Sequence, residues 1–221
     1  MSGAGTRIGF FCDFDGTISE NDMIAQIMRR FVPDEAAPLI ERVNRRELSI
    51  RAGVEAMFAL IPSSRFEEVR DFAVHTTRIR AGFDRFVDFA AARSWPITIT
   101  SGGFDFFVEP AVAPWRDRLT VYCNTLDTTG PNLRVVWPHP CDDACSADCG
   151  LCKPTILRKY QGQFDDTIVI GDGVTDFEAA RRADFVYARA SLRKECEHHN
   201  LPHAPFETFD DIVSHLHQTR G

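Results

Sequence analysis

Short hydrophobic segments alternate with amphipathic segments along most of the chain. The hydrophobic segments are rich in β-branched and aromatic residues and mostly end at turn-forming residues, which is typical of buried parallel strands. They are residues 8–14, 96–100, 119–123, 167–170 and 185–188. Between them, residues 83–93, 174–183 and 209–217 show the apolar spacing of amphipathic helices. The alternation predicts an α/β fold whose core is a Rossmann-like parallel sheet.

Residues 19–80 interrupt this alternation with three or four helical stretches and no convincing strand. Turn-forming residues separate these stretches, and Ser63 or Ser64 is expected to cap the last of them. An all-helical block inserted after the first strand of an α/β protein suggests a cap domain over the edge of the sheet. We therefore expect a core formed by residues 1–18 and 81–221, with a helical cap at residues 19–80.

A second and smaller insertion lies within the predicted core, at residues 124–152. It contains the turn residues of a predicted hairpin at 129–132 and then four of the chain's seven cysteines. These four are Cys141, Cys145, Cys149 and Cys152, with the spacing C-x3-C-x3-C-x2-C. Four thiolates could close a structural Zn²⁺ tetrahedron, although this spacing is not that of the common zinc knuckles. Buried free thiols and a redox-sensitive set are the alternatives that the sequence leaves open.

Composition and charge narrow the classes of function. The 221-residue chain carries 25 basic and 32 acidic residues, which gives a formal net charge of −7. Because no basic surplus is available to replace phosphate counterions, neither nucleic-acid binding nor anionic-membrane binding is expected. No apolar run approaches the ~18 residues of a membrane span, and residues 1–5 do not resemble a signal peptide. We expect a cytoplasmic protein, monomeric or homodimeric, whose odd number of cysteines disfavours a disulfide scaffold.

The acidic residues of interest come directly after predicted strands. Asp13 and Asp15 follow the first strand within DFDGT, and Asp172 and Asp176 follow a later strand within GDGVTD. Acids at i and i+2 point to the same side of an extended chain, and open α/β sheets bind ligands at the carboxyl ends of their strands. Four aspartates gathered there would form a hard-oxygen site suited to Mg²⁺. Taken alone, an Asp-Gly segment is also an ordinary solvated turn.

Two further segments supply groups for a phosphate. Ser101 and Gly102 follow a predicted strand just before a helix, where a hydroxyl and a backbone N–H can hold phosphate oxygens. Lys153, followed by Pro154, opens a predicted helix and brings a cation toward the acids. Each element alone is a weak signal, but the four in this order predict a phosphate-ester site.

In this order the four segments resemble the motifs of the haloacid dehalogenase superfamily of phosphatases. The resemblance implies a Mg²⁺-dependent reaction in which Asp13 is the nucleophile and Asp15 the general acid and then base. The implied metal site comprises Asp13, Asp15 (through its carbonyl), Asp172 and Asp176. Asp176 would either join that site or orient the lysine. The phosphoryl group would be held by Ser101, Gly102 and Lys153.

Longer stretches resemble one family within the phosphoserine-phosphatase-like branch, the bacterial methionine-salvage phosphatases. They are FFCDFDGTI, SGGFDFFVEP, the cysteine-bearing segment from WPHPC to CKP, and GDGVTDFEAA followed by ARASLRKEC. This resemblance implies a small phosphorylated metabolite, 2-hydroxy-3-keto-5-methylthiopentenyl-1-phosphate, as the substrate. Its methylthio group needs apolar room, for which the candidates are Phe104, Phe106, Phe107, Met23 and Trp137, although core packing is the alternative for most of them. Asp22 is a candidate contact for a substrate hydroxyl, and it fits the N-cap of a helix equally well.

Two other functions stay open at this stage. One is a phosphatase for phosphoserine or another small metabolite, and the other is a metal-binding regulatory protein with a vestigial site. The four intact motifs speak against the second, because decay would be expected to strike Asp13 first.

Overall fold

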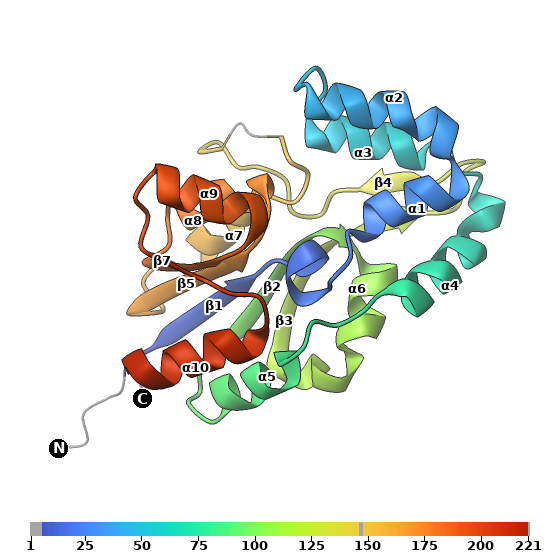
Figure 1. The fold of residues 1–221 in the computed structure, drawn as a ribbon. Coiled ribbons are helices and arrows are strands. Elements are labelled where there is room, and N and C mark those ends of the chain that lie inside the picture. The colour runs from blue at the N-terminus through green and yellow to red at the C-terminus, as the bar shows by residue number, and fades with distance from the viewer. Residues whose placement is uncertain (1–5, 146–147, 221) are drawn as a thin grey trace.

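Seven strands in the described residues form one sheet, in the order β4-β3-β2-β1-β5-β6-β7 (Figure 1). The computed structural model describes residues 6–145 and 148–220, so the expectation for residues 1–5 lies outside the described part. The strands are β1 (Ile8–Cys12), β2 (Ile97–Phe104), β3 (Leu119–Asp127), β4 (Arg134–Val136), β5 (Asp166–Gly171), β6 (Phe185–Ala188) and β7 (His203–Pro205). Neighbouring strands are parallel except β3 and β4, which are antiparallel. The predicted α/β fold is confirmed, and the hairpin predicted at residues 129–132 joins β3 to β4.

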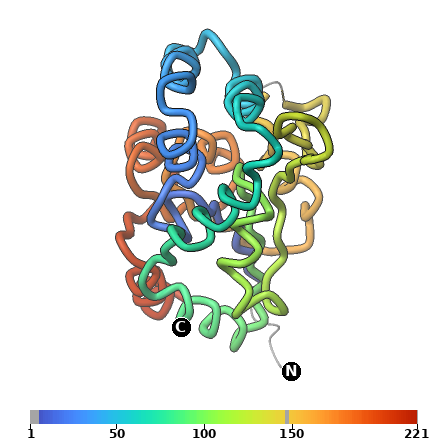
Figure 2. Tube along the Cα trace, turned by 90° about the vertical axis from the view of Figure 1, so that its right-hand side faces the viewer, coloured from blue at the N-terminus to red at the C-terminus, as the bar shows by residue number. Residues whose placement is uncertain are grey.

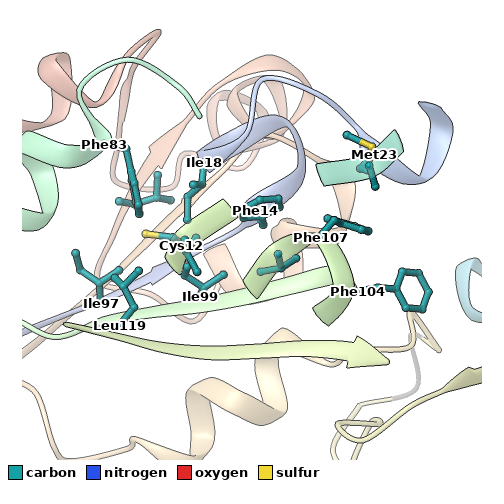
Figure 3. Close-up of a cluster of buried hydrophobic side chains, with 14 of the residues drawn as sticks. Cys12, Phe14, Ile18, Met23, Phe83, Ile97, Ile99, Phe104, Phe107 and Leu119 are labelled. Atoms are coloured by element: carbon teal, nitrogen blue, oxygen red, sulfur yellow. The ribbon is translucent and has the colours of Figure 1, made fainter. Parts of the chain in front are cut away.

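Helices cover both faces of this sheet. One face carries α5 (Phe83–Ala91), α6 (Asp105–Val112) and α10 (Phe209–Arg220), and the other carries α7 (Lys153–Lys159), α8 (Phe177–Ala180) and α9 (Ala190–His198). In β1, Phe10 packs into the first cluster of buried side chains and Phe11 into the second. Successive side chains of this strand point to opposite faces and all are buried, which is why its sequence is continuously hydrophobic. Figure 3 shows Phe14 and Ile18, from the loop after β1, among the buried side chains of the first cluster.

The helices of residues 19–80 lie beyond the carboxyl ends of the central strands (Figure 1). They are α1 (Met23–Phe31), α2 (Pro33–Asn44), α3 (Ile50–Phe58) and α4 (Phe66–Thr76), with a short 3₁₀ turn η2 (Ser63–Arg65) before the last. The two segments that connect these helices to the core lie side by side, because Ser19 and Ile79 form an isolated antiparallel bridge. Figure 2 shows α10 at the opposite end of the molecule from α2 and α3.

Several element ends differ from the sequence prediction. Strand β1 stops at Cys12, because the following residues turn into a short irregular helix, η1 (Phe14–Ile18). Strand β2 continues through Gly102 and Gly103 to Phe104, although the sequence predicts a turn at these glycines. The helix predicted at 174–183 is a 3₁₀ turn, η4 (Val174–Asp176), followed by the single turn of α8. The remaining 3₁₀ segment is η3 (Ala113–Arg118).

The predicted serine cap is also wrong, since the side chains of Ser63 and Ser64 cap neither η2 nor α4. The serine that caps a helix in this part of the chain is Ser49, whose Oγ accepts a hydrogen bond from the backbone N–H of Ala52 at the start of α3. Among the described residues, no helix is both long and apolar enough to cross a membrane.

Candidate active site

Two aspartates follow β1 at the carboxyl edge of the sheet. Asp13 comes directly after the strand and is 7% exposed, and Asp15 lies in the η1 turn. Gly16 makes this turn possible, because its φ of +78° is in the left-handed region that favours glycine. A Cβ atom at Gly16 would also lie 2.4 Å from Oδ2 of Asp172, so the site has no room for a side chain there. The DFDGT segment therefore folds around the acids that it carries.

The neighbouring strand β5 delivers the second pair of aspartates. Asp172 accepts a hydrogen bond from the Thr17 hydroxyl at 3.0 Å, which ties the two strand ends together. Asp176 turns back toward its own strand, and its Oδ2 accepts hydrogen bonds from the backbone N–H groups of Asp172 at 3.1 Å and Gly173 at 3.0 Å. Its Oδ1 accepts a hydrogen bond from Lys153. Both carboxylate oxygens of Asp176 are thus engaged within the protein.

Lys153 is the first residue of α7 and is 3% exposed. Its ammonium lies 2.7 Å from Oδ1 of Asp13 and also contacts Asp176. Burial by itself lowers the pKa of Lys153, but the two carboxylates outweigh it, so the net pKa is raised. The ammonium therefore stays charged and bridges the ends of β1 and β5.

Three carboxylates of the site could hold a metal ion. One oxygen each of Asp13, Asp172 and Asp176 lies within 4.8 Å of the others. Burial raises the pKa of Asp13 well above its usual value and the charge of Asp176 adds to the rise, while Lys153 lowers it. Burial and Asp176 also raise the pKa of Asp172. A divalent cation would relieve this repulsion, and an all-oxygen set fits Mg²⁺.

Asp15 is in a different environment from Asp13. Its Oδ1 accepts a hydrogen bond from the backbone N–H of Met23 at 2.9 Å. Burial, with the charge of Asp22 as the next cause, raises the pKa of Asp15 to about 7. A carboxyl group with such a pKa can both give and take a proton near neutral pH, which suits a general acid–base.

The glycine segment of β2 leaves open space beside these acids. A Cβ atom at Gly102 would meet no atom within 4 Å, and Gly102 and Gly103 both line the cavity described below. Ser101 is fully buried and does not line it; its Oγ accepts a hydrogen bond from the backbone N–H of Gly103 at 3.0 Å. Of the predicted phosphate-binding residues, Gly102 and Lys153 therefore face the cavity, and Ser101 supports the glycine backbone.

A cavity of about 360 Å³ joins this edge of the sheet to the helices above it. Its polar end includes Asp13, Asp15, Asp22 and Lys153. Its apolar end is lined by α1 (Ile24, Met28), α2 (Ile40, Val43), α3 (Ile50, Val54, Met57) and the residues Trp137 and Leu151. The site is thus a polar end, which carries the acids and Lys153, joined to a hydrophobic chamber.

The structure corrects one substrate contact and clarifies another. Phe104 is fully buried and packs against Phe58, with ring centroids 4.5 Å apart, so it does not line the cavity. Asp22 lines the cavity and also caps α1, accepting a hydrogen bond from the backbone N–H of Ala25 at 2.9 Å. Of the other apolar candidates, Trp137 lines the cavity, and most of the remaining wall comes from helices that sequence spacing alone did not place there.

Two arginines to which the sequence analysis gives no role hold the η1 loop. Arg80 is buried and donates hydrogen bonds to the carbonyl oxygens of Gly16 at 2.8 Å and Thr17 at 2.7 Å. Arg189 donates to the same Gly16 oxygen at 3.0 Å. No local motif marks Arg80, and the ARASLRKEC stretch contains Arg189 without indicating its contact, because each residue reaches the loop from a distant part of the chain.

The predicted cysteine set is brought together in part. The sulfur atoms of Cys141, Cys145 and Cys152 lie within 4.8 Å of one another, close enough for the three thiols to bind one metal ion. The Cys149 thiol instead donates a hydrogen bond to the carbonyl oxygen of Leu151 at 3.4 Å. Cys12, Cys123 and Cys196 lie elsewhere as free thiols.

Sequence and structure comparisons agree on the type of protein. The proteins named 2-hydroxy-3-keto-5-methylthiopentenyl-1-phosphate phosphatase from Geobacillus thermodenitrificans and Exiguobacterium sp. are 45% and 47% identical to the chain, over 210 and 205 residues. These alignments cover 95% and 93% of this chain and 96% and 95% of the relatives. A solved structure titled as a phospho-aspartyl intermediate analogue of phosphoserine phosphatase superposes with a TM-score of 0.70. It is 18% identical, and the match covers 96% of this chain and 99% of that one.

A hydrolase of Salmonella enterica serovar Typhi also superposes with a TM-score of 0.70, at 16% identity, covering 95% of this chain and 71% of that one. Residues 10–181 match the family described as haloacid dehalogenase-like hydrolases. These residues make up most of the chain and include Asp13, Lys153 and Asp176. With its motif residues gathered at one edge of the sheet, the chain belongs to the haloacid dehalogenase-like hydrolases.

Proposed function

We propose that this protein is a Mg²⁺-dependent phosphomonoesterase that dephosphorylates 2-hydroxy-3-keto-5-methylthiopentenyl-1-phosphate. The observation that carries the proposal is the cavity, which joins Asp13, Asp15 and Lys153 to an apolar chamber. The relatives that bear this activity in their names align with nearly the whole chain, which supports the choice of substrate.

The reaction follows from the positions of two aspartates. A carboxylate oxygen of Asp13 attacks phosphorus, the bond between phosphorus and the leaving oxygen breaks, and Asp15 gives its proton to that oxygen. Water then attacks the phosphorus of the aspartyl-phosphate while Asp15 takes one of its protons. Inorganic phosphate leaves and Asp13 is restored. The same carboxyl group thus serves both halves of the reaction.

Two other groups stabilise the transferring phosphate. The Lys153 ammonium beside Asp13 offsets the negative charge that gathers on the phosphoryl oxygens. The backbone at Gly102 borders the open space next to them and offers room for an oxygen to approach. Bound Mg²⁺ would neutralise further charge as a Lewis acid. The residues that would hold it are Asp13, Asp172 and the carbonyl of Asp15. Asp176 lies within reach of the same position, but both of its oxygens are already engaged, so its role would be to orient Lys153.

The chamber favours an apolar substrate tail over phosphoserine. Phosphoserine carries a carboxylate that needs a cation, and Lys153 is the one basic residue among the described residues that line the cavity. Lys153 is already engaged by Asp13 and Asp176. An unpaired buried carboxylate would lose affinity, whereas a methylthio group gains from contact with Met28, Met57 and other apolar walls.

We further propose that residues 19–80 act as a cap that closes this chamber against the loop around Asp148. The α3 end of the cap contacts Asp148 through the Ser49 hydroxyl at 2.6 Å and through Arg51, whose guanidinium lies 3.6 Å from the carboxylate. These exposed contacts are weak individually, which suits a closure that must open for product release.

The test compares kcat/KM across small phosphate esters, including the methylthio enol phosphate, its analogue without the methylthio group, and phosphoserine. We expect the full substrate to be preferred over the truncated analogue by about 10- to 200-fold, the range for lost apolar contact. Asp13→Asn should abolish turnover with every ester. Preference for phosphoserine would overturn the substrate assignment, and phosphate release that survives in Asp13→Asn would overturn the mechanism.

A further inference from the structure

Three cysteine sulfurs converge in the segment that leads from β4 to α7. The Sγ atoms of Cys141, Cys145 and Cys152 lie within 4.8 Å of one another, and those of Cys141 and Cys145 are 3.8 Å apart. This separation is almost twice the ~2.05 Å length of a disulfide bond. A Zn–S bond of about 2.3 Å gives a tetrahedral edge of about 3.8 Å, so the observed spacing is that of two thiolates on one zinc ion.

We propose that Cys141, Cys145, Cys149 and Cys152 bind a structural Zn²⁺ ion. The fourth ligand, Cys149, is half-buried in the same segment and lies close enough to Cys145 and Cys152 for their charges to interact. Its thiol now makes a long hydrogen bond to the Leu151 carbonyl oxygen, at 3.4 Å. On zinc binding, Cys149 would give up this bond for a bond to the metal. Four thiolates without a carboxylate among them select zinc over Mg²⁺.

The segment has no regular secondary structure to hold its shape. From Trp137 to Cys152 the described residues form neither helix nor strand. Short backbone bonds define its turns, from the Cys145 N–H to the Asp142 carbonyl at 3.0 Å and from the Cys152 N–H to the His139 carbonyl at 2.8 Å. A small irregular insertion with little core of its own is the setting in which a zinc ion contributes most to folding.

One cation lies beside the cluster, where it is paired with an acid of the same segment. Arg158 donates a hydrogen bond to the Asp142 carboxylate at 2.9 Å, and its charge also interacts with Cys152 and Cys145. Zinc with four thiolates carries a net charge of about −2, which this guanidinium partly offsets. Gly150 turns the chain between Cys149 and Leu151 with a φ of +87°, and a Cβ there would lie 2.3 Å from the Trp137 ring.

The proposed zinc would bear on the active site, a consequence that rests on the proposed function. Cys152 is directly followed by Lys153, whose ammonium lies between Asp13 and Asp176. Cys149 and Leu151 line the substrate cavity. A metal bound at Cys152 would therefore fix the start of α7, which places the lysine, and stiffen one wall of the chamber.

The test measures metal in untagged full-length protein purified without chelators. We expect one zinc per chain, and, after exchange, a Co²⁺ derivative with the visible and near-ultraviolet absorption of tetrahedral cobalt thiolate. Cys149→Ser and Cys145→Ser should lose zinc to a mild chelator, whereas Cys123→Ser, a half-buried thiol outside the cluster, should retain it. Zinc removal should also lower kcat, with Mg²⁺ in excess, and its return should restore kcat.

Several results would overturn the proposal. They are protein that neither contains nor takes up zinc or cobalt, iron and sulfide in its place, a disulfide among the four cysteines, and full zinc retention in Cys149→Ser and Cys145→Ser. Metal content and the cobalt spectrum do not depend on activity. A zinc protein without phosphatase activity would therefore refute the proposed function alone, and an active protein that takes up no zinc would refute the zinc site alone.

Discussion

Replacing Lys153 with methionine removes a buried cation and leaves its two carboxylate partners in place. Lys153 is 3% exposed, and Asp13 and Asp176 are 7% and 1% exposed, so only water in the cavity could partly replace the ammonium. Methionine fills most of the space of the lysine stem, so little of the effect comes from an empty cavity. The substitution thus isolates the electrostatic contribution of the ammonium.

The expected decrease in the free energy of unfolding is large and depends on pH. Removing one partner of a buried ion pair destabilises a protein by about 3–5 kcal/mol. Burial already raises the pKa of Asp13 and Lys153 holds it down, so the variant's Asp13 titrates at higher pH still. A carboxyl group with a raised folded-state pKa favours folding fully below its unfolded pKa, and this stabilisation is lost as pH rises through the folded pKa. The deficit of Lys153→Met should therefore be greatest at pH 8 and shrink toward pH 5.

Urea unfolding in Mg²⁺-free buffer at pH 5 and pH 8 measures this deficit. Lys159→Met is the matched control, because Lys159 lies on the same helix with its side chain exposed. It should change the free energy of unfolding by less than about 0.5 kcal/mol. An equal deficit for Lys153→Met at both pH values would refute the electrostatic reasoning, and no deficit at all would refute the buried ion pair.

Three more substitutions test the site and its support. Asp22→Asn keeps a side chain that caps α1 but removes a charge that raises the pKa of Asp15. The alkaline limb of the pH profile of kcat/KM should therefore move from about pH 7 to lower pH, and an unchanged limb would contradict this. Arg80→Lys leaves the carbonyl oxygens of Gly16 and Thr17 without all of their hydrogen-bond donors. Urea unfolding should show a free energy of unfolding lower by about 1–3 kcal/mol, and turnover should fall. Wild-type values of both would refute a positioning role. Phe58→Ala empties a fully buried site between α3 and β2, and thermal or urea unfolding should show a loss of about 3–5 kcal/mol, with a loss below about 1 kcal/mol contradicting the packing.

The sequence could predict those residues of the site that stand next to strands. Asp13 and Asp172 follow β1 and β5, and parallel strands meet at one edge, so local pattern was enough to gather them. Strand β7 and helix α9 escaped prediction, because a three-residue strand and a mostly polar helix carry little periodic signal. The hydrophobic pattern places the end of β1 two residues late, because Phe14 extends the pattern past Asp13 while the backbone already turns after Cys12.

The sequence by itself determined the fold class, the order of the motifs and the aspartates of the site, because these depend on periodicity and on positions next to strand ends. Tertiary structure alone decided which side chains surround them. Arg80 reaches Gly16 across 64 residues of sequence, and Phe104 turned out to be core while Met57 lines the cavity. The sulfur spacing of the cysteines was likewise invisible in their C-x3-C-x3-C-x2-C pattern. Such contacts are set by the packing of distant elements, and side-chain directions and distances there follow from close packing rather than from local sequence.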